Sequence, residues 1–146
     1  MDCGDCIMGT RSLTYVYEGE TPIICMYRQF DGYLEGHGQE LANFLNELTI
    51  GNGISDKAEL FSFANGMGDL AAQMIVWFKK TPGGFYIYPV EMNQDCWQEY
   101  EYHVYENKVV VKNPDEVIFE GSWNEFLLLT TEKESDNIES KAVYGN

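Results

Sequence analysis

The first clear pattern along the chain is a pair of β-rich runs joined by a short polar turn. Residues 11–17 and 22–28 are rich in β-branched and aromatic side chains, and the Gly-containing segment 18–21 separates them. Two such runs at this spacing predict a β-hairpin, and Pro22 is tolerated because it stands at the start of a strand. The sheet is therefore expected to begin with this hairpin.

Two helices are predicted in the next part of the chain. After a loop over residues 29–38, apolar side chains in the segment 39–48 recur at the i, i+3, i+4, i+7 spacing of one buried helical face. Residues 68–80 are apolar nearly all round, which indicates a second helix at the centre of the fold. The intervening residues 49–65 show no clear period and are expected to form a long loop, which in a small domain is often functional.

The second half of the chain consists mostly of predicted strands. Segments rich in β-branched and aromatic side chains cover residues 85–88, 100–105, 109–112 and 117–121. Ser122 and Glu125 then have the S-x-x-E spacing of a capping box ahead of an apolar run. A short closing helix is expected there.

This order of elements favours an α+β fold over an alternating β-α-β fold. Adjacent strands that form hairpins build an antiparallel sheet, and helices grouped together in the sequence cover one face of it. A length of 146 residues fits one domain. We expect a single α+β domain over residues 10–130, an N-terminal extension over 1–9 and a polar, flexible tail over 131–146.

The charge of the chain restricts its partners. Nine basic residues stand against twenty-four acidic ones, which gives a formal charge of −15. Such a charge repels nucleic-acid backbones and anionic membranes, so general binding to either is not expected. The acidity serves solubility or forms a face that meets a basic partner. A cytoplasmic location is expected, because no apolar run is long enough to span a bilayer and the acidic start lacks the pattern of a secretory signal.

The cysteines give only a weak indication of a metal site. Cys3 and Cys6 have C-x-x-C spacing, but zinc normally requires a second pair, and Cys25 and Cys96 are scattered. Met8 also resembles an alternative start residue. Inert thiols are therefore expected, with no metal and no cofactor.

The richest concentration of polar groups lies between the hairpin and the first predicted helix. In residues 27–40, three glycines alternate with side chains able to make directional contacts, and glycine lets a backbone approach a ligand closely. A second glycine-rich helix start covers residues 65–69. The candidate ligand-binding residues are Arg11, Arg28, Gln29, Asp31, Tyr33, His37, Gly38, Asn65, Gly66 and Gly68.

The two arginines of the chain suggest what such a site would bind. Arg11 begins the first predicted strand and Arg28 ends the second, so a tight hairpin would bring them together at its open end. Helix N-termini carry unpaired N–H groups and a partial positive charge. Together these features predict recognition of a phosphate or carboxylate. The alternative is that each arginine neutralises a nearby acid, for instance Arg28 with Asp31.

His37 is the candidate for acid–base chemistry. It lies between two glycines, with Asp31, Glu35 and Glu40 nearby in the sequence, and its ordinary pKa range suits proton transfer. No nucleophile elbow or metal-binding pattern accompanies it. Catalysis, hydrogen bonding to a ligand and bracing of the loop all remain open for His37, whereas His103 is expected to be an ordinary sheet residue.

The ten tyrosines fall largely in predicted strands. Alternation such as that of Tyr100 and Tyr102 places rings on one face of a sheet. Cross-strand packing accounts for such a pattern. Stacking against a nucleobase is the alternative, and it would fit beside an anion site without a basic groove.

Several segments resemble a group of small proteins encoded by bacteriophages and bacteria. The similarity lies in residues 8–13, 27–33, 36–41 and 64–73, including a YRQFDGY-x-x-GHG-x-EL pattern and an ANGMG-x-LAAQ pattern, and it extends over roughly residues 8–90. Leu34 departs from the proline expected at its position. The resemblance implies an origin but does not indicate which activity the protein has. The pair Cys3 and Cys6 lies outside it.

The sequence thus predicts a small acidic protein that binds a small anionic ligand, which could be derived from a nucleotide. By analogy with small phage proteins, such a protein could sequester a signal in counter-defence, with its pocket formed within one chain or between the subunits of a homo-oligomer. Two alternatives stay open. One is a small-molecule hydrolase that uses His37, and the other is an acidic inhibitor that occupies a basic site on a host protein.

Overall fold

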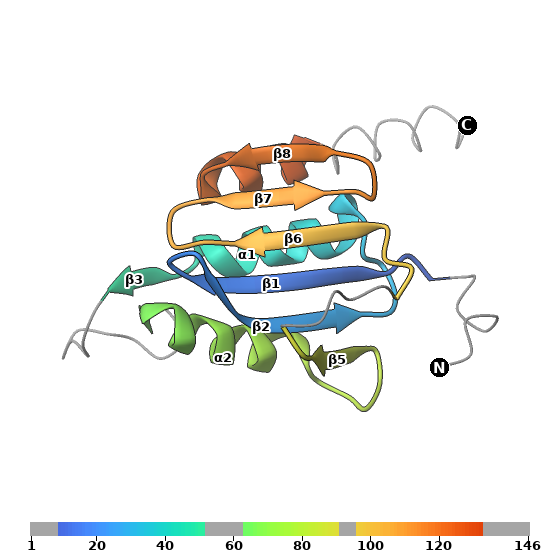
Figure 1. The fold of residues 1–146 in the computed structure, drawn as a ribbon. Coiled ribbons are helices and arrows are strands. Elements are labelled where there is room, and N and C mark those ends of the chain that lie inside the picture. The colour runs from blue at the N-terminus through green and yellow to red at the C-terminus, as the bar shows by residue number, and fades with distance from the viewer. Residues whose placement is uncertain (1–8, 52–62, 91–95, 133–146) are drawn as a thin grey trace, which may run out of the picture.

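The structure, a computed structural model, is built on a six-stranded sheet with the strand order β5-β2-β1-β6-β7-β8 (Figure 1). It describes residues 9–51, 63–90 and 96–132. Helices lie behind the sheet in this view, and the opposite face is turned toward the viewer. The predicted α+β class, with one sheet covered by helices on one face, is confirmed.

The predicted hairpin forms the centre of the sheet. Strand β1 (Ser12–Glu18) pairs antiparallel with β2 (Thr21–Arg28), and β5 (Phe85–Tyr88) adds to the outer side of β2. The pairing of β1 with β2 shifts by one residue between Val16 and Tyr17, as in a β-bulge. This shift decides which face each later residue of the hairpin occupies.

The other half of the sheet is a meander. Strands β6 (Tyr100–Val104), β7 (Val109–Lys112) and β8 (Val117–Gly121) pair antiparallel in sequence, as predicted. β6 joins the hairpin by pairing parallel with β1, with Ser12 opposite Tyr100. This one parallel junction in the six-stranded sheet was not predicted, because nothing in either local pattern specifies a partner so distant in sequence.

The predicted loop over 29–38 contains helical structure. Residues Leu34–Gly38 form a π-helical turn, η2, that continues without a break into α1 (Gln39–Asn46). The N–H of Gln39 bonds to the carbonyl oxygens of Leu34 and Gly36. The periodicity in this region therefore identified the helix but not its first turn, because three glycines and polar side chains hide a buried π turn.

The second helix, α2 (Gly66–Phe78), lies two residues earlier than predicted and is not central. The backbone of Lys79 is extended, and this ends the helix. One side of α2 is buried, but Val76 and Trp77 are 53% and 39% exposed on the other. The prediction that this helix is central is therefore wrong. Its residues are apolar nearly all round, but one apolar side of it faces outward.

The predicted loop over 49–65 includes a second, very small sheet. Strands β3 (Thr49–Gly51) and β4 (Phe63–Asn65) pair parallel, and β4 runs directly into α2. Strands of three residues are too short to show alternation, so the sequence pattern could not reveal them. Residues 52–62 lie outside the described part of the chain.

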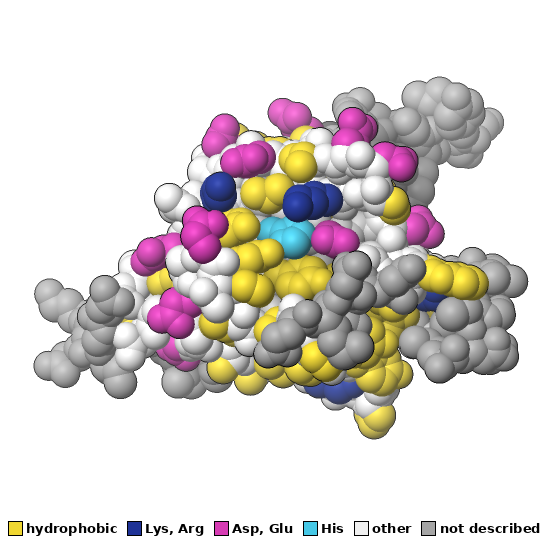
Figure 2. Space-filling view, in the orientation of Figure 1, with side chains coloured by type: hydrophobic (Ala, Val, Ile, Leu, Met, Phe, Trp, Pro, Cys, Tyr) yellow, Lys and Arg dark blue, Asp and Glu magenta, His cyan; other side chains and the backbone are white. Residues whose placement is uncertain are grey.

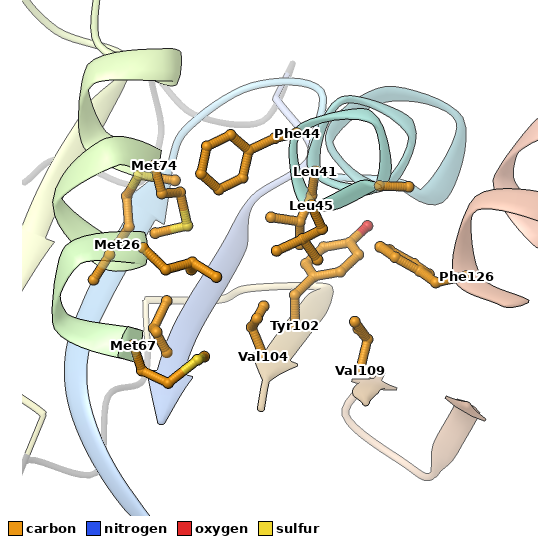
Figure 3. Packing of buried hydrophobic residues seen from close by; sticks show 14 of the residues in the cluster. Met26, Leu41, Phe44, Leu45, Met67, Met74, Tyr102, Val104, Val109 and Phe126 are labelled. Carbon is orange, nitrogen blue, oxygen red and sulfur yellow. The ribbon is translucent and has the colours of Figure 1, made fainter. Parts of the chain in front are cut away.

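The main core lies between the sheet and its helices. Figure 3 shows Leu41 and Leu45 of α1 and Met67 and Met74 of α2 directed into the space above the strands, with Phe44 of α1 lying between the two helices. The strands contribute side chains that alternate onto this face, and the closing helix adds Phe126. The buried residues that the six-stranded sheet contributes to this core are Val16, Met26, Tyr102, Val104, Val109 and Val111.

The opposite face of the sheet carries a smaller cluster. Leu13, Cys25 and Tyr27 are buried there, with Val90 and Cys96 from the segment between β5 and β6 packed against them. Figure 2 shows this face, on which a histidine lies among hydrophobic side chains with charges of both signs nearby. The sheet thus has one face that the helices cover over most of its strands and one face that is partly open.

The closing helix has the predicted capping box. Residues 123–132 are helical, and Glu125 N–H donates to Ser122 Oγ at 3.1 Å while Ser122 N–H donates to Glu125 Oε1 at 2.9 Å. We expect Ser122→Ala to lower the free energy of unfolding by about 1 kcal/mol, because a helix N–H loses its acceptor. Urea unfolding checks this. Asn124→Ala, at an exposed helical site two residues after Ser122, is the control. An equal loss in both variants would contradict the cap.

Two expectations about the ends of the chain stay predictions. Residues 1–8 and 133–146, which include most of the predicted extension and tail, lie outside the described residues. Among the helices that are described, none is long and apolar enough to cross a membrane.

Candidate functional site

Arg28 lies at the centre of the polar cluster that the sequence singled out. Its side chain is only 11% exposed, and its guanidinium lies 4.9 Å from the ring centroid of Phe85 and 6.0 Å from that of Phe78. Nε donates to the carbonyl oxygen of Phe30 at 2.6 Å, and Nη1 is paired with the carboxylate of Glu40. The cation is therefore already neutralised by an acid of the same chain, although that acid is Glu40 and not Asp31.

His37 lies beneath Arg28 and is completely buried. Arg28 Nη1 lies 3.2 Å from His37 Nδ1, and His37 Nε2 lies 2.7 Å from Thr14 Oγ1. A guanidinium can only donate, so Nδ1 accepts and Nε2 carries the proton that is donated to Thr14. Both ring nitrogens are thereby occupied within the protein.

The surroundings keep His37 neutral. Burial lowers the pKa of His37 well below its ordinary value, and the positive charge of Arg28 lowers it further. The rings of Phe78 and Tyr102 lie 4.8 Å and 5.0 Å from the imidazole centroid. A buried, neutral imidazole with both nitrogens bonded fits a bracing role and gives no support to proton transfer with a substrate.

The loop before His37 uses its own N–H groups. Gly36 and Gly38 donate to the carbonyl of Tyr33, and His37 donates to that of Asp31. Asp31 has a left-handed φ of 62°, which directs the chain into this turn. Backbone carbonyls therefore already accept the N–H groups of Gly36, His37 and Gly38, which does not support the predicted anion cradle at this helix start.

Arg11 and Arg28 are on opposite faces of the sheet, so the predicted pair of cations is wrong. Arg28 faces the helices with Thr14, whereas Arg11 is buried on the other face, near Tyr27, and donates to the carbonyl of Cys96 at 3.2 Å. The bulge between Val16 and Tyr17 is the physical reason. Without that shift the tight turn would place residues 11 and 28 opposite each other, but Arg28 is opposite Ser12.

The second glycine-rich helix start lies far from this cluster. Asn65, Gly66 and Gly68 are at the first end of α2, while Phe78, at its other end, contacts His37. Thirteen helical residues place these ends about 18 Å apart. At the first end, the N–H of Asn65 donates to the carboxylate of Asp69 at 2.8 Å. The two predicted cradles therefore do not form one site.

The remaining candidate residues serve the local fold or face outward. Gly38 is buried, and a Cβ there would approach Leu34, Tyr102 Oη and Thr130 at 3.3 to 3.5 Å. Gln29 joins β2 to β5 through its N–H, which donates to the carbonyl of Gly84. Tyr33 is 37% exposed beside Asp31.

The open face of the sheet holds a hydrogen-bonded chain that the sequence did not reveal. His103 Nε2 lies 3.0 Å from Glu101 Oε1, and Tyr17 Oη lies 2.6 Å from His103 Nδ1. Gln98 Nε2 donates to the other carboxylate oxygen of Glu101 at 3.1 Å. The hydrogen bond from His103, followed by that from Gln98, lowers the pKa of Glu101, so its carboxylate is charged at neutral pH.

The tyrosine rings on this face cover one another. Tyr17 and Tyr105 are stacked with centroids 4.2 Å apart, and Tyr15 is stacked on His103 at 5.0 Å. In each stacked pair, the face of one ring is covered by the face of the other. This arrangement supports the cross-strand packing interpretation over a platform for nucleobases.

A hollow of about 320 Å³ opens beside Glu101, lined by residues 97–101 together with Asn113 and Pro114. Trp97 is 64% exposed and has a left-handed φ of 62°, a conformation that is strained for a bulky residue. The N–H of Glu99 donates to the carbonyl of Arg11 at 2.9 Å, which attaches this segment to β1. The hollow therefore combines an exposed indole and two acidic residues on an anchored backbone.

The described ranges contain no grouping of metal-ligating side chains, and one of their two cysteines, Cys25, is buried. No group of three or more His, Cys, Asp or Glu side chains within these ranges could hold a metal ion. Cys25 is buried, and burial raises the pKa of its thiol to about 11. Cys3 and Cys6 lie outside the described residues.

Comparison with known proteins gives no assignment. No family model, no curated protein and no solved structure matches the chain. The resemblance in residues 8–90 therefore stays a prediction.

Sequence reasoning missed the hollow because its parts are distant in the chain. Residues 97–101 lead into β6 and include its first two residues, whereas Asn113 and Pro114 belong to the β7–β8 turn. One signal was available. Trp97 lies among polar residues, outside any periodic apolar pattern, and a tryptophan in such a position is a candidate for an exposed contact residue.

Proposed function

We propose that the protein binds a basic partner protein, taking a lysine or arginine side chain of that partner into the hollow beside β6. The observation that carries the proposal is the lining of this hollow by Trp97, Glu99 and Glu101. A cation over an indole ring, with carboxylates alongside, is a favourable arrangement for an ammonium or guanidinium group. The formal charge of −15 adds a long-range attraction for a basic partner.

The hollow is organised before any partner arrives. Glu101 is held by His103 and Gln98, and His103 is held in turn by Tyr17. Lys112 is opposite Glu101 in the β6–β7 pair and helps to balance its charge. Glu99 and Trp97, both exposed, are therefore the groups that a partner would meet first.

This proposal replaces the anionic ligand as the function that the geometry favours. An anionic ligand was expected to join Arg11 and Arg28, which lie on opposite faces of the sheet. A hydrolase was expected to use His37, which is fully buried and bonded at both nitrogens. The acidic binding protein, the remaining alternative, needs neither arrangement.

Calorimetric titration with a decapeptide of lysine tests the site. We expect Trp97→Ala to weaken binding about 5-fold to 10-fold, since an exposed cation–π contact contributes on the order of 1 kcal/mol. Glu99→Gln is expected to weaken it to a similar degree. Glu106→Gln removes the same charge from an exposed position outside the hollow and is expected to have little effect.

Three results would contradict the proposal. The first is an equal loss of affinity in Glu99→Gln and Glu106→Gln, which would show attraction to the net charge without a site. The second is unchanged binding in Trp97→Ala. The third is tight binding of inorganic phosphate that disappears in Arg28→Lys, which would restore an anion site.

A further inference from the structure

The open edge of the sheet at β5 differs in charge from the rest of the molecule. Residues 70–90, which include most of α2 and all of β5, form the longest interval of the chain without Asp or Glu. Two lysines, Lys79 and Lys80, lie in it. Twenty-four acidic residues are distributed over the remainder of the chain. Contact between two copies through β5 and the part of α2 beyond Asp69 would therefore bring together no carboxylate of these two segments.

The same edge exposes apolar side chains. Tyr86 and Ile87 of β5 are 43% and 54% exposed. On α2, Ile75 and Lys79 lie beside β5, and the neighbouring Val76 is 53% exposed. A small apolar hollow of about 110 Å³ lies between the two elements, lined by Ile75, Lys79, Ile87 and their neighbours. Figure 2 shows hydrophobic side chains gathered over this end of the molecule, with Lys or Arg below them. Adjoining apolar residues of this kind mark an interaction surface.

The backbone of β5 is suited to pairing with another strand. β5 is the last strand on its side of the sheet and pairs only with β2 among the described strands. Gly84 bonds inward through its carbonyl to Gln29, so by alternation Phe85 and Ile87 direct their backbone groups to the open side. Lys79 Nζ already bonds to the carbonyl of Phe85, so the backbone groups of Ile87 are the ones that a second strand would meet. The opposite edge strand, β8, carries Glu120, which is paired with Lys108 at 3.3 Å. A charge of this kind protects an edge, and no residue of β5 itself is charged.

The two lysines are engaged within their own chain. Lys79 Nζ donates to the carbonyls of Gly83 and Phe85, and Lys80 Nζ donates to that of Val76. Lys80 therefore offsets a carbonyl of the last turn of α2, whereas Lys79 bonds to the turn that follows α2 and to the first residue of β5. A second copy, whose matching surface is equally apolar and equally free of acids, fits this edge better than a strongly charged partner.

We propose that two copies of the chain associate through β5 and the outward side of α2. The two β5 strands pair antiparallel around a twofold axis near Ile87, and the two sheets become one continuous sheet. Because such an axis is perpendicular to the sheet, both α2 helices lie on the same face and bury Val76 against each other's apolar side chains. The hollow beside Trp97 is not part of this contact, so the dimer is independent of the proposed binding of a basic partner.

Sedimentation velocity on the full chain tests the proposal. We expect a species of twice the 16.7 kDa chain mass. Added salt is expected to strengthen the dimer, since screening reduces the repulsion between two acidic molecules. Ile87→Glu is expected to weaken association ~100-fold or more, because the twofold axis places two unpaired carboxylates in the contact.

Val117→Glu is the matched control. Val117 is 51% exposed on β8, the opposite edge strand, so this variant adds the same charge at an equally exposed apolar site. It is expected to remain a dimer, and circular dichroism of both variants checks that the fold is kept. A monomeric wild-type chain at high salt would overturn the proposal. Dissociation by Val117→Glu but not by Ile87→Glu would also overturn it, by placing the contact at β8.

If Ile87→Glu fails to fold, hydrogen exchange of the wild-type protein tests the contact instead. The Ile87 amide hydrogen is expected to exchange more slowly in concentrated than in dilute protein, and equal exchange at both concentrations contradicts the contact.

Discussion

Gly36→Ala is expected to lower the free energy of unfolding by about 3 kcal/mol or more. A Cβ atom at this position would lie 2.5 Å from the carbonyl oxygen of Asp31 and 3.2 Å from the ring of Tyr33. The same carbonyl accepts the N–H of His37 at 2.8 Å, so the turn cannot move away without losing that bond. Overpacking of a rigid site together with a broken hydrogen bond falls in this range.

Gly68→Ala is the matched control for this prediction. Gly68 lies in α2, and a Cβ there would meet no heavy atom within 4 Å. Alanine is expected to raise stability by about 0.5 to 1 kcal/mol, because it favours a helix over glycine. Urea unfolding of both variants gives the comparison. A Gly36→Ala protein as stable as the wild type would show that the π-helical turn has room that the structure does not give it.

The stability of the protein is expected to decrease as the pH falls below about 6.5. Burial lowers the pKa of His37 in the folded state, whereas the unfolded chain titrates near the ordinary value for histidine. Below that value the unfolded state binds a proton that the folded state does not, so acid favours unfolding. The loss is expected to approach about 1.4 kcal/mol per pH unit until the folded-state pKa is reached.

His37→Gln separates this effect from other titrations. Glutamine can still bond to Thr14 and Arg28, but it does not titrate, so the slope of stability against pH between 6.5 and 5 is expected to become shallower. The variant should also be less stable than the wild type at neutral pH, since its side chain fills the site less well. Glu101, whose pKa is also lowered, adds to the loss of stability only as the pH falls below the ordinary pKa of a glutamate, which lies outside this window. If the slope of stability against pH is unchanged in His37→Gln, a group other than His37 causes the loss of stability.

Local patterns predicted the parts of the fold that local forces determine. The hairpin, the β6–β8 meander and the capping box at Ser122 all depend on residues within a few positions of one another. The β1–β6 junction depends on residues far apart in sequence, and β3 and β4 are too short to show a period. These are the elements that the sequence did not reveal.

The candidate site shows how one residue can reverse an interpretation. Arg28, His37 and Glu40 do form a cluster, as their concentration in the sequence suggested. The bulge at Val16, however, moved Arg28 to the face opposite Arg11, and burial of His37 turned a candidate acid or base into a brace. Side-chain direction in a strand has a period of two, so a shift of one residue is enough to separate two groups.

The parallel pairing of β1 with β6 has a consequence for the order in which the chain folds. Ser12 cannot meet Tyr100 until the segment between them, more than half of the chain, has been synthesised and its ends have closed. Before that moment the hairpin exposes the inner edge of β1, which the finished protein covers completely. A nascent chain or fragment that stops before β6 therefore presents an unpaired central strand, and such species are prone to aggregate.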